Sequence, residues 1–386
     1  MTHITLDRSM FPAGERDLVK ARGLSVRAFR FKSGVEGLRI EGRRATLVLL
    51  PFRGQQVWSF EVDGQSCAMR SMVAEPAAGP GFLESFGAFF VHCGLMAMGA
   101  PGPQDAHPLH GEFPSAPMDE AWIEIEELAG DSLVRVGGRY DHAAMFRGHY
   151  RAEPWVLLRS GATVFEVGMT LVNRAASPMP FMYLGHANFR PVDGGRLVYS
   201  APYTPDAVRV RRSIPPHVTP AAGYPELIAT LAREPSVHHR LDPGLRFDPE
   251  VVFMVDYRAD ADGWAHSLQI HPDGTADWIA HRPDQCPRAI RWLSRTPDQE
   301  CLALVEPATS GVEGYHEERA AGRVPVLAPG ATWRAVMRMG RLTATAALVL
   351  ERKADGIAGR NAPPWPGEAG CAGSETAGVM RRDRES

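Results

Sequence analysis

TVFEVGMTLVNRAASPMPFMYLGHANF, residues 163–189, contains two runs of β-branched and aromatic residues on either side of a polar turn that ends in proline. This pattern predicts two antiparallel strands joined by a short loop. Side chains alternate between the faces of a strand, so one face of the second run carries Met182, Leu184, His186 and Asn188. That face changes from apolar to polar, as expected where a strand leaves a core and enters a cleft. A core histidine bonded to a backbone carbonyl is the alternative for His186.

Similar segments recur on both sides of this hairpin. Residues 56–62 and 65–70 flank Asp63-Gly64, a dipeptide that suits a type I′ turn. Further strands are expected at residues 46–50, 122–128, 133–140, 155–158, 251–257, 267–270, 289–293, 301–305 and 332–339. Helices should be few and short, at residues 15–21, 82–90 and 224–231. So many strands without crossover helices predict an all-β fold, a large antiparallel sandwich or a barrel.

Composition excludes several classes of protein. Of the 386 residues, 44% are hydrophobic and 23% are charged. The formal net charge of −3 disfavours a general nucleic-acid binder, which would need a basic surface. Lysine occurs only at Lys20, Lys32 and Lys353. A Schiff-base enzyme or a P-loop is therefore not expected, because both need a suitably placed lysine.

The cysteines predict a cytoplasmic protein, and the hydropathy predicts that the chain does not span a membrane. The five cysteines are odd in number, scattered and without a CxxC motif, which predicts a reducing compartment and no disulfides. They are Cys67, Cys93, Cys286, Cys301 and Cys371. No apolar run reaches the roughly 20 residues of a membrane span, and no signal peptide is visible. We expect an N-terminal extension at 1–39 packed on the sandwich, a sandwich domain at 40–353 and a disordered Pro/Gly/Ser-rich tail at 354–386.

Two further segments could carry chemistry. HPLHGE, residues 107–112, follows a Gly/Pro-rich stretch that would suit the rim of a pocket, although a surface histidine in a turn is the alternative. CLALVEPAT, residues 301–309, is an apolar strand that ends at Glu306. Burial there would raise the pKa of Glu306 toward that of a usable base, whereas an ordinary charge at a strand end is the alternative.

Taken together, these segments resemble the aldose 1-epimerase, or galactose mutarotase-like, superfamily. The matching elements are Leu-His-Gly at 109–111, Gly-His-Ala-Asn-Phe at 185–189 after the Pro-Met-Pro turn at 178–180, and Val-Glu-Pro-Ala-Thr at 305–309. Glu-Pro-x-Thr and the Gly/Pro segment are most similar to a divergent branch known as a domain of unknown function, DUF4432. The resemblance covers about residues 40–342. It implies a mutarotase-like supersandwich with few short helices.

The resemblance also implies a function in carbohydrate metabolism. The chain would be a cytoplasmic isomerase that interconverts sugar anomers without a cofactor or metal. Its partner would be a small sugar or sugar derivative, with no nucleic acid and no membrane, and it would be a monomer or homodimer. Motif by motif, Glu306 is implied as the base, His186 as the acid and His110 as the group that polarises the ring oxygen.

Substrate-binding roles are implied for Asn188, His107, Arg70 and Asp256. Galactose mutarotases have a substrate-binding aspartate and an Asn-Arg dipeptide that have no clear match in this sequence. Asp256 is the candidate for the aspartate, and Arg70 is the candidate for the dipeptide. Glu112 replaces the second glycine that usually follows Leu-His-Gly. A sugar acid or phosphate would call for an arginine, and the available ones are Arg190, Arg288 and Arg291. Trp58 and Trp292 could stack on a sugar or pack in the core.

Two other functions remain as alternatives. A metal-dependent cupin-type enzyme could use His107, His110 and Glu112, but residues three apart on a strand point to opposite faces. A non-catalytic sugar-binding or sensor protein could keep the same pocket without its chemistry.

Overall fold

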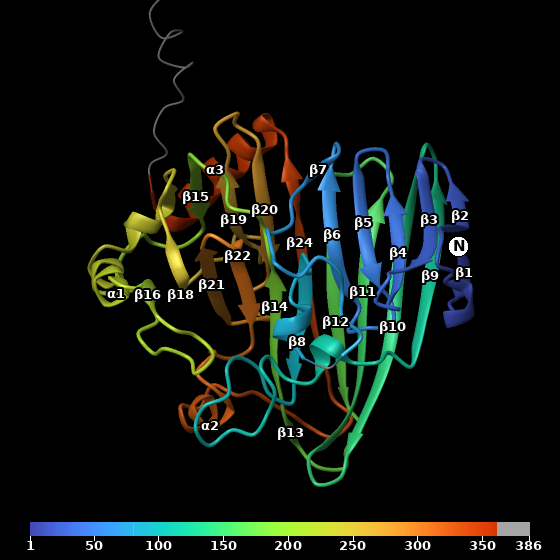
Figure 1. Ribbon diagram of the computed structural model, residues 1–386, viewed down its shortest axis with the longest axis horizontal. Coiled ribbons are helices and arrows are strands. Elements are labelled where there is room, and N and C mark those ends of the chain that lie inside the picture. The colour runs from blue at the N-terminus through green and yellow to red at the C-terminus, as the bar shows by residue number, and fades with distance from the viewer. Residues whose placement is uncertain (80, 361–386) are drawn as a thin grey trace, which may run out of the picture.

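The computed structural model describes residues 1–79 and 81–360, which form two large antiparallel sheets (Figure 1). The first sheet has ten strands, in the order β1 (Thr2–Thr5), β9 (Glu120–Leu128), β10 (Asp131–Ala144), β11 (Gly148–Arg159), β12 (Val164–Asn173), β24 (Thr332–Leu342), β20 (Ala276–His281), β19 (Ala265–Ile270), β15 (Gly195–Tyr199) and β17 (Arg240–Leu241).

The second sheet has twelve strands. Eleven follow the order β16 (Val208–Val210), β18 (Phe247–Val255), β21 (Arg288–Arg295), β22 (Glu300–Ala308), β14 (Met182–Ala187), β8 (Phe90–Leu95), β6 (Gln56–Val62), β5 (Ala45–Leu50), β4 (Glu36–Glu41), β3 (Leu24–Arg30) and β2 (Arg16–Ala21). The twelfth, β7 (Gln65–Ser66), pairs with β6 across the expected Asp63-Gly64 turn. A separate small sheet pairs β13 (Met179–Pro180) with β23 (Val326–Leu327).

Helices are few. The α-helices are α1 (Tyr224–Arg233), α2 (Tyr315–Ala320) and α3 (Ala344–Ala358), and the 3₁₀ turns are η1 (Arg8–Met10), η2 (Leu83–Ser85), η3 (Phe113–Ser115) and η4 (Pro235–His239). Within residues 1–79 and 81–360, none of these helices has the length and apolar character needed to cross a membrane.

The main core fills the space between the two sheets. Phe60 on β6 and Phe165 on β12 meet across it, with ring centroids 5.0 Å apart. On β14, Tyr183 and Ala187 point into this core, whereas Met182 and Leu184 pack in a second cluster on the opposite face of the twelve-stranded sheet. The predicted all-β sandwich and the predicted alternation along 182–187 are thus confirmed, and β14 is buried on both faces. The predicted hairpin is wrong, because β12 belongs to the ten-stranded sheet and β14 to the twelve-stranded sheet, so the turn between them connects the two sheets.

The expected division of the chain does not coincide with its elements. Residues 1–39 supply β1 to one sheet and β2, β3 and the start of β4 to the other, so they are strands of the sandwich rather than an extension packed on it. The expected helix at 15–21 is largely strand β2. The expected tail boundary at residue 354 lies inside α3, which begins at the N-cap Thr343 and ends at Gly359. The rest of that expected tail, 361–386, lies outside the described residues.

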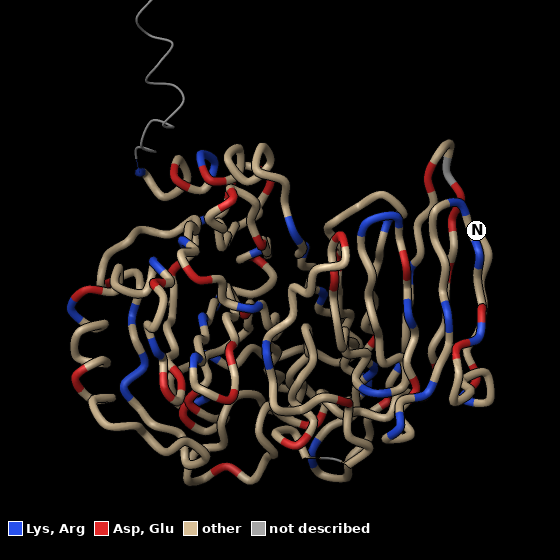
Figure 2. Tube along the Cα trace, turned by 45° about the horizontal axis from the view of Figure 1, so that its top comes forward, with Lys and Arg blue, Asp and Glu red and all other residues tan. Residues whose placement is uncertain are grey.

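Burial explains why the helix continues past residue 354. Ala354 and Ala358 are buried, and the Arg360 guanidinium donates hydrogen bonds to the carbonyl oxygens of Ala201 and Tyr199 at 2.5 and 2.9 Å. Cys67, Cys93, Cys286 and Cys301 are buried free thiols, and Cys371 lies outside the described residues. Figure 2 shows basic and acidic residues interspersed along both sheets.

Candidate active site

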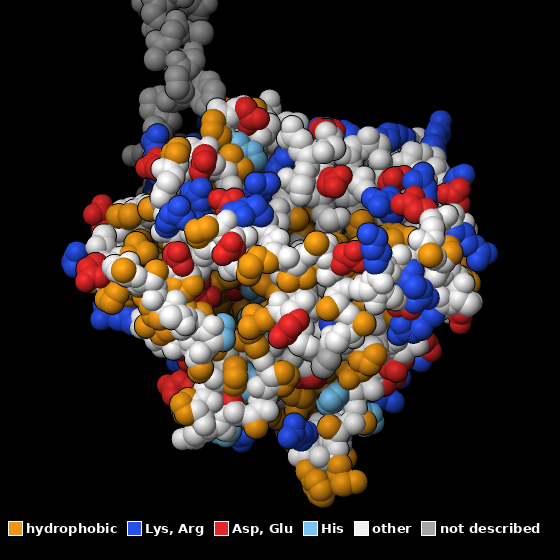
Figure 3. All heavy atoms as spheres, in the orientation of Figure 1, with side chains coloured by type: hydrophobic (Ala, Val, Ile, Leu, Met, Phe, Trp, Pro, Cys, Tyr) orange, Lys and Arg blue, Asp and Glu red, His pale blue; other side chains and the backbone are white. Residues whose placement is uncertain are grey.

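A cavity of about 390 Å³ opens on the face of the twelve-stranded sheet that is turned away from the main core. Its walls come from strands β14, β18, β21 and β22 and from loops near residues 71–86, 99–110 and 211–219. Hydrophobic side chains gather around this part of the surface (Figure 3). A concave, mostly apolar site with a few convergent polar groups is typical of small-molecule binding.

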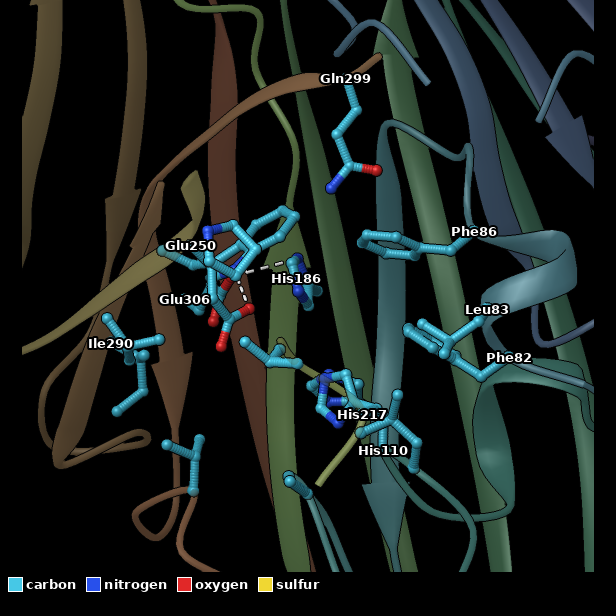
Figure 4. Close-up of a pocket in the computed structure, with 18 of the residues that line it drawn as sticks. Phe82, Leu83, Phe86, His110, His186, His217, Glu250, Ile290, Gln299 and Glu306 are labelled. Atoms are coloured by element: carbon cyan, nitrogen blue, oxygen red, sulfur yellow. Dashed lines mark hydrogen bonds and ion pairs between the residues drawn. The ribbon is translucent and has the colours of Figure 1, made fainter. Parts of the chain in front are cut away.

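Glu306 and His186 meet at the wall of this cavity. β14 and β22 are antiparallel with Leu184 opposite Ala308, so the same register places His186 opposite Glu306. His186 Nδ1 lies 3.1 Å from Glu306 Oε1, and both side chains are almost completely buried (Figure 4). These two atoms are closed off from solvent and have no other partner among the described residues. Both residues line the cavity.

Burial keeps this pair uncharged. It raises the pKa of Glu306 well above the ordinary value, and the nearby Glu250 carboxylate raises it further. Burial also lowers the pKa of His186 to about 3, against a smaller opposing effect of a hydrogen bond with Asn188. Both shifts favour the uncharged forms, in which the pair combines one acidic proton with one basic nitrogen.

His110 is placed beside this pair by a tight turn. His110 and Gly111 both have left-handed backbones, with φ of 59° and 82°. A Cβ on Gly111 would lie 2.1 Å from the carbonyl oxygen of Ala97, so glycine is required there. The His110 ring lies 5.4 Å from the His186 ring, and its Nδ1 is buried without a partner. Burial lowers the pKa of His110 well below its ordinary value, which leaves a neutral imidazole.

Glu112 explains how this turn is held. One of its carboxylate oxygens accepts hydrogen bonds from the backbone N–H groups of Leu95 and Met96 at 2.9 and 3.0 Å and from the Tyr150 hydroxyl at 2.6 Å. The carboxylate thus occupies the place where galactose mutarotases were expected to have a second glycine, and it fastens the His110 turn to the end of β8. It acts on the loop rather than on a ligand.

Four expected substrate-binding residues lie elsewhere. Asn188 is buried behind the cavity, where its amide donates to the Ala88 carbonyl. The His107 ring contacts the Pro108 carbonyl rather than the cavity. Arg70 bonds to Glu300 and to the carbonyls of residues 296–298. Asp256 forms a two-armed ion pair with Arg209. None of the four lines the cavity, and each contacts other protein groups.

Several lining residues were not identified from the sequence. Glu250, from strand β18, which ends one residue before the expected Asp256, lines the cavity and accepts a hydrogen bond from Trp292 Nε1 at 2.7 Å. Arg211 is the arginine that lines the cavity, instead of Arg190, Arg288 or Arg291. A count of alternate positions along residues 247–255 could have placed Glu250 and Val252 on one face, but nothing in the sequence marked Arg211.

Aromatic side chains complete the wall. Phe86 lies 5.1 Å from the His186 ring and 5.9 Å from Trp292, measured between ring centroids, and Phe82 packs at 4.7 Å on His110. Trp292 thus borders the cavity, whereas Trp58 belongs to the packed cluster beneath. Such flat apolar surfaces suit the C–H face of a sugar ring.

The cupin-type alternative is not supported by the geometry. Glu112 bonds to the loop backbone and to Tyr150, and His107 is turned toward Pro108. In the described part of the chain, no three His, Cys, Asp or Glu side chains converge as a metal site would require.

Comparisons with known proteins agree with this architecture. Residues 32–200 match the family model of a domain of unknown function, DUF4432. A solved structure of a candidate aldose 1-epimerase from Klebsiella pneumoniae superposes with a TM-score of 0.76 at 19% identity, covering 94% of this chain and 97% of that one. A galactose mutarotase-like protein from Clostridium acetobutylicum gives a TM-score of 0.53 at 11% identity, over 83% of this chain and 99% of the other.

A candidate mutarotase from Salmonella typhimurium gives a TM-score of 0.51 at 10% identity, over 86% of this chain and 97% of the other. No curated protein matches the sequence. At these identities the structural likeness establishes the fold. The chain therefore has the galactose mutarotase-like fold, in a divergent form whose residues 32–200 match the DUF4432 family model.

Proposed function

We propose that this protein is an aldose 1-epimerase-like isomerase that interconverts the anomers of a sugar by opening and closing its ring. The observation that carries the proposal is the buried contact between Glu306 and His186 at the wall of the cavity, 3.1 Å from atom to atom. Solved structures of the same fold that are named as mutarotase-like or as candidate aldose 1-epimerases support the reaction class.

The reaction needs one acid and one base. Ring opening removes the proton of the C1 hydroxyl and delivers a proton to the ring oxygen as the C1–O5 bond breaks. The product is an open-chain aldehyde with a free hydroxyl, which turns about the C1–C2 bond and closes again by the reverse steps. Protons balance within the enzyme and the sugar, so the step needs no further reactant.

The Glu306–His186 pair supplies both groups. In its uncharged form Glu306 holds the acidic proton and His186 offers a basic nitrogen. Transfer of that proton across the 3.1 Å contact gives carboxylate and imidazolium, in which Glu306 is the base and His186 the acid, as the family resemblance implies. The two forms differ only in the position of one proton, which suits a reaction that must run equally in both directions.

His110 and the aromatic wall would position the sugar. The buried Nδ1 of the neutral His110 ring could hydrogen-bond to the ring oxygen or an adjacent hydroxyl. Phe86 and Trp292 would pack against the C–H face of the ring. Glu250, fixed by its bond from Trp292 Nε1, would accept hydrogen bonds from sugar hydroxyls.

Anomer exchange measured by NMR magnetisation transfer on a panel of monosaccharides tests the proposal. We expect Glu306→Gln to lower the enzyme-catalysed exchange rate by about 10²–10⁴-fold, because the amide cannot transfer a proton. Glu300→Gln is the matched control, since Glu300 lies on the same strand but bonds to Arg70 outside the cavity. Equal rates for the Glu306→Gln variant and the unchanged protein would refute the assignment. Sugar binding without any accelerated exchange would instead favour the non-catalytic alternative.

A further inference from the structure

Arg211 is the one Lys or Arg among the described residues that line the cavity. It directly follows β16, and its backbone N–H donates to the Val252 carbonyl of β18 at 2.7 Å. Only 9% of the residue is exposed. The sheet therefore fixes where this cation enters the cavity.

Its guanidinium is held on one side and free on the other. The Nε–H donates to Ser213 Oγ at 2.8 Å, and Glu313 Oε1 lies 3.3 Å from the same nitrogen. None of the described residues accepts a hydrogen bond from either Nη group. Neither Nη group is among the atoms that are closed off from solvent without a partner, so both remain accessible at the wall of the cavity that Arg211 lines. Anionic oxygens are the strongest partners of such N–H donors.

Other ionisable groups lie around Arg211. Arg211 and His217 both act electrostatically on His110, and Figure 4 draws His217 next to His110. Glu250 and Glu306 also line the cavity and act electrostatically on each other. Arg211 and Glu250 both act on Tyr224, and Glu313 pairs with Arg211, so the guanidinium lies among imidazoles and carboxyl groups.

We infer that the site selects sugars that bear an anionic group, a carboxylate or a phosphate ester. The Nη groups of Arg211 would bind the anionic oxygens as a fork, while the anomeric centre faces Glu306 and His186. Glu313 and Ser213 hold the Nε edge and so orient the fork toward the cavity. The reaction part of this inference rests on the proposed function, whereas the anion recognition does not.

Equilibrium binding tests the inference without relying on catalysis. Calorimetric titration would compare glucuronate, galacturonate and glucose 6-phosphate with the neutral sugars glucose and galactose. We expect an acidic sugar to bind at least about tenfold more tightly than its neutral counterpart. The carboxylate and phosphate arms show which anion the fork accepts.

Variants at two adjacent arginines separate local from general charge effects. Arg211→Gln should weaken acidic sugars about tenfold or more and leave neutral sugars unchanged. Arg212→Gln removes the same charge from an exposed side chain outside the cavity and should change neither. Arg211→Lys keeps the charge but not the fork and should give an intermediate loss, which also covers the case in which Arg211→Gln does not fold. Equal binding of acidic and neutral sugars, or of acidic sugars to Arg211→Gln and to the unchanged protein, would overturn the inference.

Anomer exchange on the same samples distinguishes the two proposals. Arg211-dependent binding of acidic sugars without accelerated exchange would uphold the inference and reject the proposed function. Accelerated exchange of neutral sugars that is insensitive to Arg211→Gln would do the opposite.

Discussion

Glu306 and His186 lie on adjacent strands, and their protonation is set by burial more than by each other. Neither side chain contacts solvent to a significant extent, so the uncharged forms are favoured for both. This arrangement differs from a surface ion pair, in which both partners would be charged at neutral pH. The two shifts favour the form in which the pair holds a single transferable proton.

The pH dependence of exchange follows from these directions. His186 gains a second proton only near its lowered pKa of about 3, and Glu306 loses its proton only well above the ordinary value. We expect no loss of the enzyme-catalysed rate constant, after subtraction of the uncatalysed rate, as the pH falls from about 7 to about 5, because His186 remains neutral there. NMR exchange spectroscopy across that range measures it. A loss of activity with a midpoint near pH 6.5, the ordinary value of histidine, would contradict the assigned protonation.

At the residue scale, the sequence predicted the residues of the proposed acid–base group better than the binding residues. Glu306, His186 and His110 all line the cavity, and each could be predicted because it belongs to a short motif with a definite place in the family resemblance. Residue type alone pointed to Arg70 and Asp256 as binding residues, and each is paired with a protein group. Arg211 could not be identified, since its position depends on how β16 pairs with β18.

The elements around the site include one turn whose backbone must be glycine. Gly111 has φ of 82°, and its hydrogen atoms face the carbonyl oxygens of Ala97 and Gly94. The turn joins the end of β8 to η3 and sets the direction of His110. A side chain at this position would push the turn away from β8.

Alanine substitution at two glycines tests this requirement. Gly130 has a similar φ of 87°, but an added Cβ would meet nothing within 4 Å. Gly130→Ala should therefore lower the free energy of unfolding by only about 1 kcal/mol, the cost of the left-handed backbone. Gly111→Ala carries the same cost plus a backbone clash, so we expect a loss of about 2 kcal/mol or more together with reduced ligand binding. Urea denaturation measures both, and equal losses for the two variants would contradict the argument.

Elements with a clear period were predictable and the others were not. The strands β12 and β14 were expected because the alternation along both is explicit in the sequence. Their pairing as a hairpin was wrong, because the turn between them carries the chain from the ten-stranded to the twelve-stranded sheet. β8, with the sequence FVHCGL, is buried on both faces and shows no alternation, so periodicity did not reveal it. α3 was missed because its hydrophobic face is built of alanines, which carry a weak apolar signal, although Thr343 and Gly359 mark its ends.

The molecule as a whole contains many buried histidines that are neutral when folded. Burial lowers the pKa of His92, His186, His239 and His281 to about 3 in each case. In the unfolded chain these side chains would titrate near pH 6.5. The unfolded chain therefore binds more protons below pH 6.5, and the stability that these residues preserve above that pH is lost as the pH falls toward about 3.

As the pH falls, the free energy of unfolding should therefore begin to decrease at a higher pH than protonation of the carboxylates alone would cause. Each such histidine lowers the free energy of unfolding by about 1.4 kcal/mol per pH unit between pH 6.5 and its folded pKa. Glu306 has the opposite sign, because its raised pKa favours the folded state at low pH, and it offsets one histidine. Urea denaturation at about pH 7.5, 6 and 5 measures the slope.

His281 offers a direct test of this slope. Both of its ring nitrogens are buried, and neither has a partner among the described residues. His281→Phe should reduce the pH dependence by about one proton and raise the stability at pH 5. His3→Phe is the control, because His3 is exposed and should leave the slope unchanged. An identical slope for His281→Phe and the unchanged protein would show that His281 does not titrate on unfolding.

The cavity also has a consequence for how an unknown ligand can be found. Its walls come from positions as far apart in the sequence as Ser71 and Val312, which are synthesised at quite different times. A ligand can therefore bind only after the whole sheet has folded. A molecule that fits must raise the melting temperature of the entire domain by mass action. A collection of metabolites can accordingly be ranked by thermal shift alone, with no assumption about the chemistry that follows binding.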